Sequence, residues 1–409
     1  MKVLIINTWE KTGGAAIAAN RLHKALLKAG VESVMLVMKK ESDDVTVVSP
    51  FSLLEQEYNK LLPTISVLPL LKYNKTRKKT LFSPHFMAKD LSQIINEIDP
   101  DIVHIHWINA GFMSLKTLLK IDKPIVWSLH DMWLFTGGCH YSDNCVKFTQ
   151  QCGDCFILGG TKFNDLSYEV WRKKNEIFQN CNIVINGLSK WIMNSAKKSS
   201  LLKNKTHINL PNLIDTDLYK VFDKTIARKI WNLSSNKKLI LFGAMHATSD
   251  TRKGYQELKN ALSFLQKSQD FELVIFGSNN NEKISDYFHT HFIGRLNDDI
   301  SLMLLYNAVD VMVVPSKQEN LSNVIMESLS CGTPVVAFDI GGNSDMIDHK
   351  INGYLAKPYD PKDLANGVEW VINNKDYEQI SYNARKKVLE NFSEEVVIKK
   401  YIKFYENLL

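Results

Sequence analysis

Residues Asp310 to Asn343 read DVMVVPSKQENLSNVIMESLSCGTPVVAFDIGGN, and they indicate the architecture of the whole chain. The apolar run Asp310–Val314 predicts a buried strand, which a proline and a polar loop end. Ser322 is a suitable N-cap for the helix that follows, and Gly332 stands where a left-handed residue ends it. A second apolar run, Val335–Phe338, predicts the next strand. Strand, loop, helix and strand in this order form one unit of a parallel sheet.

Two carboxylates flank the start of the predicted helix, Glu319 in the loop and Glu327 in the second helical turn. A helix N-terminus offers backbone amides that bind phosphate groups. Carboxylates repel phosphate, but they accept hydrogen bonds from sugar hydroxyl groups. A nucleotide sugar requires both kinds of group side by side: amides that bind its diphosphate and carboxylates that accept hydrogen bonds from its hydroxyl groups. The alternative is that Glu319 is a solvated loop residue and Glu327 a surface charge, since a pair of Glu residues is a weak motif.

The segment PSKQENLSNVIMESLSCGTPVVAFDIGGNSDMI, which begins at Pro315, resembles the signature of the retaining glycosyltransferases of family 4, also called group 1. The bacterial enzymes of this type build surface polysaccharides, and the resemblance extends over nearly the whole chain. It implies the GT-B fold, an α/β architecture of two Rossmann-like doubly wound domains that face each other across a cleft. It also implies that Glu319 contacts the donor sugar and Glu327 the ribose.

The chain departs from the commoner family pattern directly after Glu319, where glycines usually follow. Four other residues stand there, and we expect their backbone amides still to face a phosphate: Asn320, Leu321, Ser322 and Asn323. The departure means that the preference for a donor sugar cannot be read from the family at large.

A second predicted strand and helix bracket the segment Arg252-Lys253-Gly254. Sugar transfer leaves a nucleoside diphosphate, whose growing negative charge needs fixed cations and helix-end amides. The segment resembles the Lys-Gly of the family, whose lysine holds the diphosphate, so Lys253 is the stronger candidate. The family often has an arginine where this chain has Met245, and Arg252 is the candidate substitute. The alternative is a solvated pair of basic residues before a helix.

Four glycines near the ends of predicted strands are candidate binding residues. Gly13 and Gly14 separate a first strand from an alanine-rich helix, as at the opening of a Rossmann domain. The resemblance places this loop near the donor phosphate or the acceptor; the alternative is that the glycines only permit a tight turn. Gly277 and Gly294 end two later strands, which in the family hold the base largely through the backbone. Side chains there do not distinguish uracil from guanine.

Histidines stand at the ends of two predicted strands of the first half. The strand Pro100–Trp107 contains His106 at its tip, and His130 follows the strand Ile125–Leu129. Ligands of open parallel sheets bind at the carboxyl ends of the strands, so both side chains are candidates for the site. The family carries a histidine at the position of His130, near the sugar, which favours His130 over His106. The alternative is that each is a structural residue.

Four of the six cysteines lie within 17 residues, in the pattern C-x5-C-x6-C-x2-C. A Cys-x-x-Cys turn chelates metal, and a second pair completes a tetrahedral thiolate site for zinc. We hypothesise a structural zinc at Cys139, Cys145, Cys152 and Cys155 that shapes a loop on the acceptor side. Free or redox-active thiols are the alternative. The reaction itself is expected to need no metal or other cofactor.

The segment Tyr58 to Phe86 combines leucines with a basic cluster. Pro63 and Pro69 argue against one long helix. Such a segment can lie on an anionic membrane surface, where each basic residue contributes roughly 1 kcal/mol. The other interpretation, which we favour slightly, is a helix packed on the sheet and a solvated basic loop, because amphipathic basic segments are common on soluble proteins.

The composition is that of a globular protein, with 409 residues, 45% hydrophobic and 23% charged. The net charge of +6 fits an anionic ligand or an anionic membrane surface, and no motif indicates a nucleic-acid partner. No run of 18 apolar residues predicts a membrane-spanning helix. The first residues are typical of a strand and show no signal-peptide cleavage site, so we expect a cytoplasmic protein. If the segment Tyr58 to Phe86 lies on a membrane, the protein is expected to be peripheral on the inner membrane face.

Alternation of strands and helices predicts an acceptor-side domain over residues 1–210, with a cysteine-rich insertion at 136–158. A nucleotide-sugar domain over 211–385 and a returning helix over 386–409 follow.

The predicted activity is transfer of a sugar from a UDP- or GDP-sugar to a lipid-linked or oligosaccharide acceptor, with retention as the resemblance implies. Two alternatives are a nucleotide-sugar 2-epimerase of the same fold and a non-catalytic subunit that binds sugar nucleotides.

Overall fold

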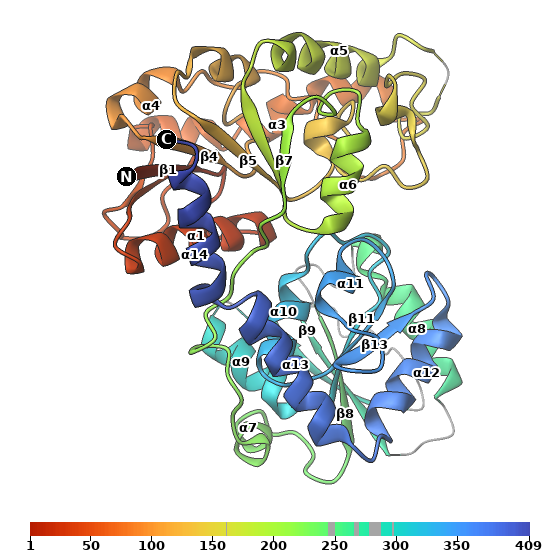
Figure 1. The fold of residues 1–409 in the computed structure, drawn as a ribbon. Helices are drawn as coiled ribbons and strands as arrows, with labels where there is room; N and C mark the ends of the chain where they lie inside the picture. Colours follow the sequence, from red (N-terminus) through yellow and green to blue (C-terminus); the bar gives the residue numbers. More distant parts are fainter. Residues whose placement is uncertain (161, 244–249, 266–269, 278–287, 297) are drawn as a thin grey trace. The chain divides into compact units, whose positions relative to one another are not determined.

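The computed structural model describes residues 1–160, 162–243, 250–265, 270–277, 288–296 and 298–409 (Figure 1). The chain forms two compact units. Unit 1 comprises Met1–Asn212 together with Ile398–Leu409, and unit 2 comprises Leu213–Val397. The sequence predicted that the second domain begins at residue 211 and that a helix over 386–409 returns to the first domain. In the structure the C-terminal part that belongs to unit 1 begins at Ile398. Met245 lies outside the described residues.

Within the described residues, unit 1 contains a seven-stranded sheet in the order β3-β2-β1-β4-β5-β6-β7, in which every pairing is parallel. Leu4 of β1 pairs with Val34 on one side and Val103 on the other. The strands are β1 (Lys2–Ile6), β2 (Glu32–Leu36), β3 (Val47–Val48), β4 (Ile102–Ile105), β5 (Ile125–Leu129), β6 (Ile183–Gly187) and β7 (Thr206–Ile208).

Unit 2, in its described part, contains a six-stranded parallel sheet in the order β10-β9-β8-β11-β12-β13. The strands are β8 (Lys238–Gly243), β9 (Phe271–Phe276), β10 (His289–Gly294), β11 (Val311–Val314), β12 (Val335–Phe338) and β13 (Gly353–Ala356). The two sheets confirm the predicted α/β class with two Rossmann-like doubly wound domains.

Helices connect the strands in both units. In unit 1 they are α1 (Gly14–Lys28), α2 (Leu53–Asn59), α3 (Leu62–Ser66), α4 (Ser92–Ile98), α5 (Leu166–Gln179), α6 (Lys190–Lys198) and the 3₁₀ turns η1 (Leu68–Tyr73), η2 (Leu115–Lys120), η3 (Trp133–Phe135) and η4 (Lys147–Thr149). From unit 2 onward they are α7 (Lys224–Ile230), η5 (Thr251–Lys253), α8 (Tyr255–Phe264), α9 (Asp299–Ala308), α10 (Asn323–Ser330), α11 (Asn343–Met346), α12 (Pro361–Ile372), α13 (Tyr377–Asn391) and α14 (Glu394–Glu406). None of the described helices is long and apolar enough to cross a lipid bilayer.

The segment 310–343 forms the elements that its sequence predicts. β11 and β12 match the two apolar runs, and α10 follows Ser322 at the N-cap position. Gly332 takes a φ of 76°, the left-handed conformation predicted for the residue that ends the helix.

The strand order reverses at one place in each sheet. In unit 1 the chain leaves β1 toward β2 and returns on its other side at β4, and in unit 2 it leaves β8 toward β9 and returns at β11. The connections of the two neighbouring strands then run to opposite faces, which opens a crevice at their carboxyl ends. Open α/β sheets bind ligands at such switch points. The segments after β1 and β4, and after β8 and β11, are therefore where binding residues are expected.

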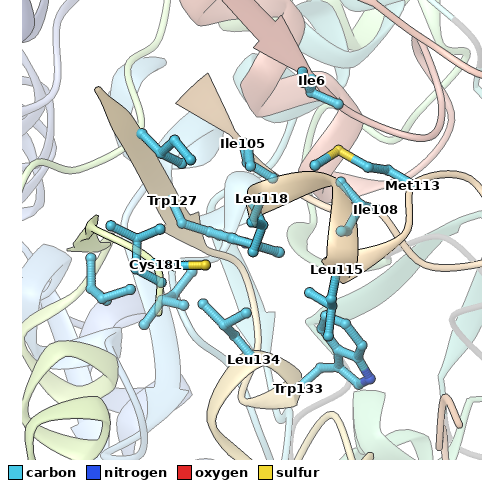
Figure 2. Close-up of a cluster of buried hydrophobic side chains, with 14 of the residues drawn as sticks. Ile6, Ile105, Ile108, Met113, Leu115, Leu118, Trp127, Trp133, Leu134 and Cys181 are labelled. Atoms are coloured by element: carbon cyan, nitrogen blue, oxygen red, sulfur yellow. The ribbon is translucent and has the colours of Figure 1, made fainter. Parts of the chain in front are cut away.

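A hydrophobic core supports the switch point of unit 1 (Figure 2). Ile105, Trp127 and Leu118 belong to this core, the first two on β4 and β5. The Trp127 indole donates a hydrogen bond of 2.9 Å to the carbonyl oxygen of His106, so the buried ring also fixes the backbone directly after β4. The core thus holds the strand end that carries a candidate site residue.

The C-terminal helix α14 is fastened to the sheet of unit 1 by two buried tyrosines. The Tyr405 hydroxyl lies 2.5 Å from His104 Nδ1, and the Asn186 side-chain amide donates to the Tyr401 hydroxyl at 3.0 Å. His104 and Asn186 are themselves buried, on β4 and β6. Because buried polar groups are costly without partners, these bonds fix the position of the last helical turns on the sheet.

Replacing Tyr405 by phenylalanine tests this fastening. The variant leaves His104 Nδ1 buried without its partner, and we expect a loss of about 1–3 kcal/mol in the free energy of unfolding. Tyr382→Phe, at an exposed position of α13, is the matched control and should change little. Urea unfolding followed by circular dichroism measures both, and equal stabilities of the two variants would contradict this role of Tyr405.

Candidate functional site

The switch point of unit 2 brings Lys253 and Glu319 together. Lys253 ends η5, in the connection that follows β8, and Glu319 lies in the loop between β11 and α10. The Lys253 ammonium donates to Glu319 Oε2 at 3.0 Å, and the two side chains are only 21% and 13% exposed. Neither residue is the solvated loop charge that the alternative interpretation proposed. A partly buried ion pair requires both partners, because loss of one leaves an uncompensated charge.

Two glycines determine the path of the loop that carries Glu319. A Cβ on Gly254 would lie 1.8 Å from the carbonyl oxygen of Pro315, and a Cβ on Gly341 would lie 1.8 Å from that of Glu319. Both glycines have a positive φ, of 75° and 56°. The Lys317 amide also donates to the carbonyl oxygen of Arg252 at 2.8 Å. Only glycine permits these approaches, so the backbone itself brings the loop against η5.

Arg252 is held by the acidic residue that precedes η5. Its guanidinium donates to both oxygens of Asp250, at 3.2 Å from Nε and 2.6 Å from Nη2. Burial would raise the pKa of Asp250, but the hydrogen bonds and charge of Arg252 outweigh burial and lower it. Arg252 therefore carries a charge that Asp250 already compensates.

Glu327 is not on the surface of α10, so the interpretation of this residue as a helix surface charge is wrong. Its side chain is buried, with the residue 4% exposed, and Tyr306 of α9 donates a hydrogen bond to Oε2 at 2.9 Å. Burial, together with the nearby carboxylate, raises the pKa of Tyr306 far above its ordinary value, so the phenol stays a donor. Sequence reasoning missed Tyr306, because nothing near Glu327 in the sequence indicates a partner 21 residues away.

The remaining candidates of unit 2 lie at the same edge of the sheet. Gly277 and Gly294 follow or end neighbouring strands, and the Gly277 amide donates to the Gly294 carbonyl oxygen at 2.8 Å. The residues at the head of α10 are Asn320, Leu321 and Ser322, all buried, and Asn323, which begins the helix. Their contacts with a base or a phosphate stay predictions.

The switch point of unit 1 carries a pair of histidines. His106, directly after β4, and His130, directly after β5, lie 2.8 Å apart between Nδ1 of the first and Nε2 of the second. They line a pocket of about 10 Å³ with Asn109. His106 Nε2 and the Asn109 amide nitrogen are buried and have no hydrogen-bond partner within the described part of the chain. These two polar atoms are suited to a ligand hydroxyl or a bound water.

A carboxylate lies beside the two histidines. Asp131 accepts hydrogen bonds from the Trp107 indole at 3.2 Å and pairs with His140 Nδ1 at 2.6 Å. His140 Nε2 in turn lies 2.8 Å from the Ser83 hydroxyl. Neither Asp131 nor His140 was among the predicted site residues. Their separation of nine residues, on a strand end and a cysteine-rich loop, gave no sign that they pair.

The protonation states follow from burial. Burial lowers the pKa of His130 to about 4, and burial with the neighbouring His104 and His130 lowers the pKa of His106 well below its ordinary value. Burial would raise the pKa of Asp131, but His140 and the Trp133 amide outweigh it, so the carboxyl group is more acidic than usual. Neutral imidazoles both accept and donate hydrogen bonds, which suits contact with sugar hydroxyls.

Two other predicted sets lie elsewhere in unit 1. Gly13 has a φ of 97° just before α1, and a Cβ at this position would meet no atom of the described residues within 4 Å. Gly14 begins the helix. The loop therefore has room for a ligand and needs glycine for its conformation. Cys139, Cys145, Cys152 and Cys155 line a separate cavity.

Two family models match the chain. "Glycosyl transferases group 1" matches residues 223–387, and "Glycosyltransferase Family 4" matches residues 12–151, which together make about three quarters of the sequence. The first match contains Lys253, Glu319 and Glu327. The chain belongs to these glycosyltransferases.

Relatives of similar length extend the likeness to the whole chain. An uncharacterised glycosyltransferase of Methanocaldococcus jannaschii is 26% identical over 99% of this chain and 98% of its own length. A putative colanic acid biosynthesis glycosyl transferase of Escherichia coli is 21% identical over the full length of both.

Solved structures show the same fold. Sucrose-phosphate synthase of Thermosynechococcus elongatus has a TM-score of 0.71 at 17% identity, covering 100% of this chain and 98% of its own. The Anabaena HepE protein, crystallised in complex with UDP-glucose, has a TM-score of 0.65 at 16% identity over the full length of both. The glycosyltransferase is thus of the GT-B fold.

The buried histidines of this glycosyltransferase predict a pH-dependent stability. The folded-state pKa values of His85 and His130 lie at about 4, against 6.5 in an unfolded chain. Between these values the unfolded chain binds more protons than the folded one. Stability is therefore complete above pH 6.5 and falls as the pH drops toward 4, by up to about 3 kcal/mol for each histidine.

Differential scanning calorimetry from pH 7.5 to pH 4.5 measures this loss as a falling Tm. His130→Gln removes one of the histidines that take up a proton on unfolding. The Tm of this variant should therefore fall less steeply than the wild-type Tm over the same pH range. A wild-type Tm that stays level down to pH 4.5 would contradict the assignment of neutral buried imidazoles.

Proposed function

We propose that this glycosyltransferase moves a sugar from a UDP- or GDP-sugar to a lipid-linked or oligosaccharide acceptor, with retention of the anomeric configuration, in the assembly of a surface polysaccharide. The observation that supports it most is the Lys253–Glu319 pair at the switch point of unit 2. It combines a cation for a phosphate with a carboxylate for hydroxyls at the edge of the sheet where ligands bind.

The donor would rearrange this ion pair. Before it binds, Lys253 and Glu319 compensate each other. The diphosphate would replace the carboxylate as the partner of Lys253, and Glu319 would then accept hydrogen bonds from the sugar. Each group would exchange one partner for another, so neither charge would be left buried and uncompensated.

The chemistry that this arrangement supports needs no side chain as general base. The acceptor oxygen forms a bond to the anomeric carbon on the face that the diphosphate leaves, while the bond from that carbon to the diphosphate oxygen breaks. The proton of the acceptor hydroxyl passes to a diphosphate oxygen. Lys253, Arg252 and the amides at the head of α10 would stabilise the departing charge, which does not require a metal ion.

Three further roles complete the proposal. Glu327 would bind the ribose, although its buried carboxylate and the Tyr306 bond leave it little freedom, so the ribose must approach closely. His130 would contact the transferred sugar, as the family resemblance implies. Gly277 and Gly294 would lie against the base.

The names of the relatives favour the donor and acceptor classes. HepE has been crystallised with UDP-glucose, and the Escherichia coli relative is named for colanic acid biosynthesis. Both agree with a nucleotide sugar and a polysaccharide product for this chain. A thermal-shift comparison of UDP, GDP and ADP would identify the base, because only a bound nucleotide raises Tm.

Substitution of the ion pair tests the catalytic assignment. We expect Lys253→Ala and Glu319→Ala each to lower kcat about 10²–10³-fold, the cost typical of removing one stabilising group at a developing charge. Glu327→Gln should mainly raise KM for the donor. Transfer is measured with radiolabelled donor and a panel of oligosaccharide and lipid-linked acceptors.

Lys387→Ala provides the matched control. Lys387 belongs to the same unit, is 22% exposed and pairs with Asp348 at 2.9 Å, away from the switch point. Wild-type turnover in all three site variants would overturn the assignment. Conversion of donor without acceptor would instead indicate an epimerase, and nucleotide binding without any turnover would indicate a binding subunit.

A surface of unit 1 supports contact with a membrane. The segment Tyr58 to Phe86 contains short helices rather than a single long helix, as Pro63 and Pro69 predict. Two of its leucines, Leu62 and Leu70, are buried. Other apolar side chains in and just before the segment are exposed, beside the exposed lysines at 72, 75, 78 and 79: Leu54, Tyr58, Leu61, Leu68 and Leu71. We infer that this apolar and basic surface binds the headgroup layer of an anionic membrane. A lipid-linked acceptor would reach the protein from that membrane.

Vesicle sedimentation tests the assignment. The chain should sediment with vesicles that contain phosphatidylglycerol and not with phosphatidylcholine alone, and binding should weaken at high salt. Leu61→Gln with Leu71→Gln should lower the bound fraction several-fold, whereas Ile230→Gln, exposed on unit 2, should not. Equal binding of neutral and anionic vesicles, or no effect of the leucine changes, would exclude this surface.

A further inference from the structure

We propose that Cys139, Cys145, Cys152 and Cys155 bind one zinc ion as four thiolates, and that the ion fixes the loop that positions His140 against Asp131. The four cysteines are distinct from the residues proposed to bind the donor. The proposal rests on the cavity that they share, on the amide directed at Cys152 and on the Cys-x-x-Cys spacing.

All four side chains line one cavity of about 20 Å³ in unit 1. Such a cavity has room for one small ion once the sulfurs turn toward its centre. Cys181 and Cys331 are also buried, but they belong to other parts of the chain, Cys181 in the core of unit 1 and Cys331 at the end of α10. The cavity therefore gathers the four clustered cysteines and excludes the other two.

The four cysteines share one cavity, and a backbone amide donates to one of their sulfurs. The Gly137 amide donates to Cys152 Sγ at 3.1 Å. Backbone amides directed at sulfur stabilise metal-bound thiolates by hydrogen bonding to their negative charge.

The backbone from Cys152 to Cys155 bends at Asp154. Asp154 takes a φ of 43°, and Gly153 cannot carry a Cβ, which would lie 2.4 Å from the carbonyl oxygen of Phe163. The turn brings both sulfurs to the same cavity, as the Cys-x-x-Cys spacing predicts.

Two lysines and two acidic residues lie near the cluster, and Asp165 accepts a 2.7 Å hydrogen bond from the Cys155 amide. Lys174 is fully buried and donates to the carbonyl oxygen of Thr136 at 3.0 Å and to that of Trp133. Burial lowers the pKa of Lys174 to about 7, and negative charge at Cys139 and Cys152 opposes this. Lys147, in the cavity wall, bonds to Asp154 and the carbonyl oxygen of Gly153. Zinc with four thiolates carries two negative charges, which would favour the ammonium form of Lys174.

The side chains must still move to bind the ion. As they stand, no three histidine, cysteine, aspartate or glutamate side chains among the described residues are close enough together to hold a metal. Zinc–sulfur bonds of about 2.3 Å would require the four thiols to turn from the cavity wall toward its centre.

The ion would act on the candidate site through one residue. Cys139 precedes His140, whose side chain pairs with Asp131 and whose carbonyl oxygen accepts a 2.9 Å bond from the Met132 amide. An ion that fixes Cys139 would therefore also fix His140 and, through it, Asp131, which follows His130 in the chain. His140 would thus act as a positioning residue, through its bond to Asp131.

Elemental analysis of the purified full chain tests the proposal, after dialysis against metal-free buffer. We expect about one zinc per chain in the wild type, the stoichiometry of a four-thiolate site. Cys152→Ala and Cys155→Ala should each lower the zinc content at least several-fold, whereas Cys181→Ala, the matched buried cysteine of the same unit, should retain it. Cobalt exchanged into the site should show the intense visible absorption of a tetrahedral thiolate complex.

Hydrogen exchange tests whether the zinc ion orders the cysteine-rich loop or only binds to it. Chelation should raise exchange in residues 136–157 and leave β8–β13 unchanged. A wild-type chain with no zinc and no cobalt spectrum would overturn the proposal, and a disulfide detected by mass spectrometry among the four cysteines would replace it with a redox role. Because the wild-type content alone is decisive, a cysteine variant that fails to fold does not prevent the test.

Discussion

The site depends on the close contact of two backbones at the switch point of unit 2. Gly254 and Gly341 leave no space for a side chain against the carbonyl oxygens of Pro315 and Glu319. This contact brings the connection after β8 against the loop after β11, and it places Lys253 3.0 Å from Glu319. A wider approach would separate the two charges, because neither side chain could then reach the other. The proposed exchange of partners with a donor diphosphate requires this short distance.

Local signals in the sequence were sufficient for most of the fold. Val335–Phe338 is a run of apolar residues between a proline and a turn, and β12 has these bounds. The start of α10 after Ser322 and its end before Gly332 follow from the same kind of local chemistry. The pairing of Lys253 with Glu319 was also within reach, since both follow strands that a doubly wound sheet makes neighbours.

Contacts between distant side chains could not be predicted in this way. A surface charge stayed open as the alternative for Glu327, because the sequence shows its helix but not α9, whose Tyr306 donates a hydrogen bond to it. His104 and Tyr405 are 301 residues apart, and only the fold makes them partners. The same is true of Asp131 and His140, whose pairing depends on the course of the cysteine-rich loop. Residue type identified the candidates, whereas tertiary packing decided which of them are buried and what they contact.

The proposed activity requires that a nucleoside diphosphate binds at the head of α10 with Lys253 on its phosphates. A crystal structure of the chain soaked with the nucleoside diphosphate that gives the largest thermal shift would show this binding directly. We expect a phosphate oxygen within hydrogen-bond distance of Lys253 Nζ, next to the backbone amides that follow Glu319. A diphosphate bound elsewhere, with the Lys253–Glu319 pair unchanged at 3.0 Å, would contradict the proposed site.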